Sequence, residues 1–117
     1  MEYLNRIELT GIVGSVRHIE LSSRRCARLA LVTNYSYKAE DGAEVIESTW
    51  HNIMAFSSEK ITCLENIAKG SRIHLVGRLV SRRYIGQDGC ERLSFEVRAS
   101  RMELLGGSEQ LQNESEK

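Results

Sequence analysis

The chain has 117 residues, of which 41% are hydrophobic, so it is long enough for one domain with a modest core and too apolar for wholesale disorder. Its 16 basic and 16 acidic side chains balance, and as a total this argues against a nucleic-acid partner. No run reaches the ~18–20 apolar residues of a membrane span, and the opening MEYLNRIELTG has no signal-peptide pattern, so we expect a cytoplasmic protein.

The first half of the chain has the pattern of three strands. Residues 5–20 alternate apolar and polar side chains and are interrupted by two glycines, which indicates a strand with a bulge or sharp bend. Residues 25–38 and 45–56 alternate again and flank an Asp-Gly turn signal within 40–44. We therefore predict that residues 35–38 and 45–56 form the arms of a long hairpin.

The segment after the third strand changes its period. Ser57 or Ser58 can cap a helix. Ile61, Leu64 and Ala68 follow at i, i+3 and i+7, and a Lys-Gly pair ends the segment. This spacing predicts one helix of about ten residues.

Period two returns in residues 71–86 and 91–104, which flank a QDG turn. Ile73, Leu75 and Leu79 share one face of the first of these strands. In the second, Phe95 lies between apolar residues at period two, and we assign it to the core.

The element order is therefore three strands, one helix and two strands, with a glycine-bent first strand. This order predicts an all-β fold with one short helix, a five-stranded OB-fold barrel with an extended hairpin. Such barrels commonly bind oligonucleotides or oligosaccharides on their outer face and loops.

Nothing in the sequence demands catalysis. Cys26, Cys63 and Cys90 are odd in number and widely spaced, which fits neither a disulfide framework nor a CxxC zinc site, and none has a nucleophile signature. The three histidines are 33 and 23 residues apart, without the spacing of metal ligands. We expect no enzyme, no metal and no cofactor.

Aromatic and basic side chains recur on the same strands. Trp50 and Phe56 share one face of the third strand, and Arg78, Arg82 and Tyr84 share one face of the fourth. Rings interleaved with arginines suit single-stranded nucleic acid, because the rings stack on exposed bases and the cations attract phosphates. Duplex offers no free base faces, so we expect a preference for single strands.

Periodicity alone leaves alternatives open. Trp50 fits the core as well as a stacking surface, because Ile53 and Ala55 make the opposite face of its strand apolar too. For Phe56 the core is slightly favoured, whereas Tyr84, next to arginines and a turn, is expected to be exposed. The arginines would look the same on a merely solvated face.

The stretches STWHNIMAF and IAKGSRIHLVGRLVSRRY, together with MELLG near the end, resemble the bacterial single-stranded DNA-binding proteins. The most specific parts are the Trp-His pair, the KGS turn and the basic-basic-aromatic end of the fourth strand. The similarity runs from about Asn5 to Leu105.

The resemblance implies an OB-fold domain over residues 1–105 that binds single-stranded DNA without strong sequence preference, in replication, recombination or repair. It implies a homotetramer, with a dimer left open, and places His51 near the subunit interface. It assigns base stacking to four aromatic side chains: Trp50, Phe56, Tyr84 and Tyr37. The phosphates are then expected to be bound by Arg78, Arg82, Arg83, Lys38, Arg24, Arg25 and Arg28.

Residues 106–117 are predicted to be a short acidic disordered tail. Residues 1–102 hold 15 basic and 12 acidic side chains, whereas 103–117 hold 1 and 4. Members of the family usually end in an acidic tip with Pro-Phe that recruits replication and repair enzymes, but this chain ends NESEK. We therefore expect a short-tailed form from a phage, mobile element or divergent bacterium, and recruitment through such a tip is in question.

Two rival functions use the same fold. An OB-type primosome or restart adaptor would bind mainly protein through this face. An oligosaccharide-binding OB module would also stack sugars on aromatic rings, but it has no use for the arginines beside Tyr84.

Overall fold

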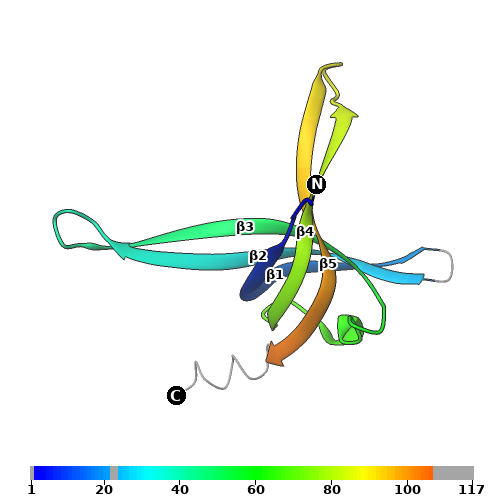
Figure 1. The fold of residues 1–117 in the computed structure, drawn as a ribbon, viewed down its shortest axis with the longest axis horizontal. Coiled ribbons are helices and arrows are strands. Elements are labelled where there is room, and N and C mark those ends of the chain that lie inside the picture. Colours follow the sequence, from blue (N-terminus) through cyan, green and yellow to red (C-terminus); the bar gives the residue numbers. More distant parts are fainter. Residues whose placement is uncertain (1, 22–23, 107–117) are drawn as a thin grey trace.

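Five strands close into a barrel in the order β1-β2-β3-β5-β4, which confirms the predicted OB-fold architecture (Figure 1). The structure is a computed structural model and describes residues 2–21 and 24–106. Its elements are β1 (Ile7–Leu21), β2 (Arg24–Lys38), β3 (Glu44–Phe56), the 3-10 helix η1 (Leu64–Asn66), β4 (Arg72–Ile85) and β5 (Glu91–Gly106).

The first strand belongs to both sides of the barrel. Its first half pairs with β4 and its second half with β2, and the change of partner falls at Ile12. A bulge between Val13 and Ser15 follows directly, as the glycine in this part of the sequence predicted. The barrel closes through a short parallel pairing of β3 with β5, at Ile53 and Val97.

The core lies inside the barrel, because every strand turns one apolar face inward. The buried side chains of the strands form a continuous cluster of Val13, Ala27, Leu29, Leu31, Ile53, Ala55, Ile73, Leu75, Val97 and Met102. Alternate residues therefore face outward, and this outer surface of the barrel is where the candidate site is found.

The predicted ten-residue helix is wrong. Only a single 3-10 turn forms, and Ser58 and Ile61 instead make an isolated antiparallel bridge. The buried residues of this segment are Ile61, Leu64 and Ile67, whereas Ala68 is exposed. A spacing of three residues fits a 3-10 turn better than an α-helix, and packing of all three side chains into the barrel core decided the conformation.

The assignment of Phe95 to the core is also wrong, since 52% of its surface is exposed. The hairpins β2–β3 and β4–β5 extend well beyond the barrel as two-stranded ribbons (Figure 1). Phe95 pairs with Ser81 in the second ribbon, outside the short pairing of β5 with β3. Leu79, which shares a face of β4 with the buried Ile73 and Leu75, is likewise exposed at the base of this ribbon.

Gly106 ends β5, so residues 107–117 of the predicted tail lie outside the described residues. No helix among residues 2–21 and 24–106 is both long and apolar enough to cross a membrane.

Candidate nucleic-acid interface

Trp50 lies on the outer face of β3, and 61% of its surface is exposed. Its neighbours Ile53 and Ala55 point into the barrel, so the core alternative for Trp50 is wrong. Trp50 is opposite Val32 on β2, and its ring reaches across that strand to Gly14 on β1. One side of the indole ring thus lies against the barrel surface at Gly14, and much of the rest of the side chain is exposed to solvent.

Phe56 lies on the same face of β3 and is half-buried. The guanidinium carbon of Arg24 stands 5.0 Å from the centre of its ring, a cation–π contact that covers part of the ring. Met54, between the two aromatic residues, is buried although it points outward. On this face the strand therefore presents two rings, with the exposed Asn52 and the buried Met54 between them.

The fourth strand continues this outer surface beyond the barrel. Tyr84 is exposed, and it shares its face with Arg78 and Arg82, as predicted from the alternation. Arg83 points to the opposite face of the β4–β5 ribbon and pairs with Glu91 at 3.4 Å. The structure therefore groups Arg82 with Tyr84 but separates Arg83 from both.

Tyr37 and Lys38 lie near the tip of the β2–β3 hairpin and, as neighbours in a strand, point to opposite faces. Tyr37 packs beside Tyr35, with 6.1 Å between the ring centres. By the alternation of β2, this pair lies on the face opposite to that of Val32 and Trp50. Lys38 shares the face of Trp50, whereas Tyr37 does not.

Arginines from β2 and β5, the two strands on either side of β3, meet on the outer face of the barrel around a single carboxylate. Glu96 on β5 accepts a hydrogen bond from Nε of Arg98 at 2.8 Å and pairs with Arg28 of β2 at 3.5 Å. Burial by itself would raise the pKa of Glu96, but the hydrogen bond from Arg98 and the charges of Arg98, Arg28 and Arg82 outweigh it and lower this pKa. Glu96 therefore stays ionised among the arginines.

Sequence reasoning named Arg28 but missed Arg98 and Glu96. The signal was present, because residues 96 and 98 alternate with the buried Val97 and so had to face outward together. Arg25, expected to bind phosphate, forms an ion pair with Glu65 beside η1.

His51 points to the inner side of β3, opposite to Trp50. It is half-buried, and its Nε2 lies 2.9 Å from the hydroxyl of Thr33 on β2. Burial lowers the pKa of His51, so the imidazole favours its neutral form.

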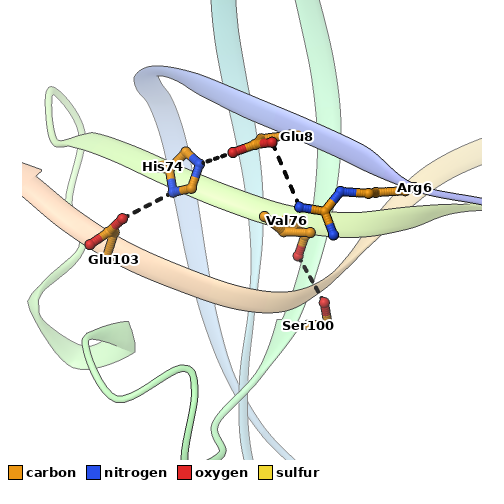
Figure 2. Close-up of polar contacts among 6 residues, drawn as sticks. All are labelled: Arg6, Glu8, His74, Val76, Ser100 and Glu103. Atoms are coloured by element: carbon orange, nitrogen blue, oxygen red, sulfur yellow. Dashed lines mark hydrogen bonds and ion pairs between the residues drawn. The ribbon is translucent and has the colours of Figure 1, made fainter.

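A second polar cluster lies on the outer surface of β1, β4 and β5 (Figure 2). His74 contacts Glu8 at 2.6 Å through Nε2 and Glu103 at 3.0 Å through Nδ1, and Arg6 pairs with Glu8 at 3.7 Å. The part of the chain that the structure describes holds no group of three His, Cys, Asp or Glu side chains arranged to bind a metal ion.

The profile of the Single-strand binding protein family matches residues 4–105. The chain belongs to this family. The resemblance inferred from the sequence motifs is thereby confirmed over most of the chain.

Named relatives agree with this membership. The chain is 31% identical over 107 residues to a single-stranded DNA-binding protein of Neisseria meningitidis, covering 89% of this chain and 61% of the relative. It is 30% identical over 106 residues to one of Xanthomonas axonopodis, covering 89% of this chain and 59% of the relative. The chain thus spans about 60% of the length of these curated relatives.

Solved structures share the fold. A Plasmodium falciparum SSB in complex with ssDNA superposes with a TM-score of 0.74 at 22% identity, covering 91% of this chain and 96% of that one. A deletion mutant of the single-stranded DNA binding protein of Thermus aquaticus gives 0.74 at 23% identity, covering 89% and 51%. A small single-stranded DNA-binding protein of Streptomyces coelicolor gives 0.67 at 19% identity, covering 89% and 95%.

Proposed function

We propose that this protein is a non-catalytic single-stranded DNA-binding protein that coats and protects single strands during replication, recombination or repair. One observation carries the proposal: in a chain of the Single-strand binding protein family, Trp50 is 61% exposed on the outer face that also holds Arg28 and Arg98. A large exposed ring beside cations suits a ligand that offers both flat bases and phosphates.

Binding begins with electrostatic capture and continues with stacking. Arg78, Arg82 and Arg28 attract the phosphates, and the released counterions make the affinity fall as salt rises. Trp50, Phe56 and Tyr84 then stack on bases, each contributing about 1–3 kcal/mol. The tip of the β2–β3 hairpin adds Tyr37 and Lys38 from the side, and Arg24, Arg25 and Arg83 add further positive charge.

Assembly completes the proposal. The family resemblance supports a homotetramer of OB-fold domains that each comprise residues 1–105, with His51 near the interface between subunits. The lowered pKa of the half-buried His51 supports this role, because a neutral imidazole is less costly to bury in an interface. We place the protein in the cytoplasm, where it meets DNA and the proteins of replication and repair.

The single tryptophan provides the test. Its fluorescence is measured while oligo-dT, and then duplex of equal length, is added at low and moderate salt. We expect strong quenching by the single strand alone, weakening as salt rises. No response in folded protein would contradict DNA binding through this face and favour the adaptor that binds protein.

The oligomer is tested separately by light scattering after gel filtration. A mass of four chains is expected for the wild type, and His51→Tyr is expected to shift the population toward smaller species. A monomeric wild type would contradict the proposed assembly without affecting the fluorescence result.

A further inference from the structure

The registers of the barrel align four arginines in one row. Arg17 lies opposite Arg28, Arg28 opposite Met54, Met54 beside Arg98, and Arg98 opposite Arg78. All five side chains face outward, and neighbouring strands are about 4.8 Å apart. The row therefore crosses all five strands of the barrel, with the buried Met54 as its apolar centre.

This arrangement is unfavourable for the protein alone. Like charges directly opposite each other destabilise a strand pair, and here Arg17 faces Arg28 and Arg98 faces Arg78. The carboxylate in contact with the row is that of Glu96, which pairs with Arg28 and Arg98. Four guanidinium groups and one carboxylate leave the row strongly positive, so it is suited to a polyanion.

Glu96 lies beneath the arginines rather than in front of them. Its side chain is 10% exposed, whereas those of Arg28 and Arg98 are 47% and 27% exposed. Each carboxylate oxygen of Glu96 accepts a hydrogen bond from one arginine: Oε1 accepts from Arg28, and Oε2 accepts from Arg98. Because Arg98 uses its Nε for this bond, its two terminal nitrogens remain available to an anion from outside.

We propose that Glu96 is a positioning residue, which holds Arg28 and Arg98 as a phosphate site at the centre of the arginine row. This inference rests on the proposed function and adds to it a site for the nucleic-acid backbone that crosses the barrel beside Trp50. If Glu96 were instead an anion that competes with phosphate for the arginines, removal of its charge would raise the affinity for DNA rather than lower it.

The deciding variant is Glu96→Gln in the full chain. Affinity for oligo-dT is measured by fluorescence anisotropy over a series of salt concentrations. Although the substitution raises the net charge by one, we expect the affinity to fall about tenfold, as for loss of a charged hydrogen bond. The slope of log affinity against log salt should also become shallower, by about 0.7 for each phosphate that the variant no longer binds.

Glu91→Gln is the matched control. It removes the same charge from the same strand and also breaks an ion pair, but Glu91 is exposed and points to the other face of the ribbon. Because Glu91→Gln changes the charge only near the ribbon, it should bind oligo-dT as tightly as the wild type or more tightly. Circular dichroism and thermal unfolding verify that both variants are folded.

Arg98→Lys provides a second route if Glu96→Gln folds poorly. Lysine keeps the charge but lacks the planar fork that binds Glu96 and phosphate at the same time, so binding should weaken as in Glu96→Gln. The two substitutions disrupt the same site, so their effects should not add. The variant that combines Glu96→Gln with Arg98→Lys should bind oligo-dT about as tightly as the weaker-binding of the two single variants.

Three results would overturn the inference. Tighter binding of oligo-dT by Glu96→Gln would show that Glu96 competes with phosphate, and unchanged binding would show that it has no role in binding. Unchanged binding by Arg98→Lys would show that Arg98 is not part of a phosphate site. Wild-type protein that fails to bind oligo-dT refutes the proposed function itself, and the role of Glu96 with it.

Discussion

The indole ring of Trp50 lies across Gly14, two strands away on the outer face of the barrel. A Cβ atom at position 14 would overlap the ring and stand 2.6 Å from its Cη2 atom. Gly14 lies within the bulge of β1, between Val13 and Ser15. The missing side chain therefore creates a shelf that supports one side of the indole and leaves the other side exposed.

Gly14→Val is expected to lift the ring from this shelf. Because Trp50 is mostly exposed, the ring will move rather than the barrel, so the near-ultraviolet circular dichroism of the tryptophan should change while unfolding changes little. Affinity for oligo-dT should fall, since a displaced ring stacks less well. Ser15→Val, at the exposed neighbouring position, should leave the tryptophan signal as it is; an unchanged signal in Gly14→Val would contradict the contact.

Trp50→Ala separates binding from stability. We expect a loss of about 1–3 kcal/mol in binding of oligo-dT, measured by anisotropy, because one stacked base loses its partner. The free energy of unfolding should change little, since the ring is 61% exposed. A large loss of stability with unaltered binding would instead make the indole a structural element.

Phe95→Ala tests the boundary between barrel and ribbon. Phe95 is 52% exposed, so urea unfolding should show a small loss of stability, well below that of a core substitution. Leu75→Ala, which empties a buried position of β4, should cost about 2–5 kcal/mol. Similar losses for the two variants would mean that the ribbon side chain is covered in solution.

The cluster around His74 predicts a pH dependence of stability. The hydrogen bond to Glu8, opposed by burial and reinforced by the second bond to Glu103, raises the pKa of His74 above its ordinary 6.5. The hydrogen bond with His74 in turn lowers the pKa of Glu8 below its ordinary 4.5. The stabilisation from His74 is complete below pH 6.5 and is lost as pH rises through the raised pKa. That from Glu8 is present above pH 4.5 and is lost as pH falls through the lowered pKa.

His74→Gln should therefore destabilise the protein more at about pH 6 than at about pH 9, as measured by urea unfolding. His51, whose pKa is lowered, penalises the fold as pH falls, but it is present in both proteins and cancels in the difference. An equal difference at the two pH values would show that the contacts with Glu8 and Glu103 do not depend on the charge of His74.

The sequence by itself determined the strands and the family. Period-two alternation placed Trp50 with Phe56 on one face of its strand and Arg82 with Tyr84 on one face of theirs, and Asp-Gly signals marked the turns, because these features depend only on neighbours along the chain. That the face of Trp50 is the outer one was decided by the structure. The Trp-His pair and the basic end of the fourth strand sufficed to indicate the family whose profile matches residues 4–105.

Only the tertiary structure decided which residues meet across strands. Alternation states that Glu96 and Arg98 share a face, but not that closure of the barrel brings Arg28 of β2 against them. It also cannot state where a strand leaves the barrel, and so it misplaced Phe95. The ten-residue helix failed for the same reason: burial of Ile67 in the core, rather than the local period, determined that segment.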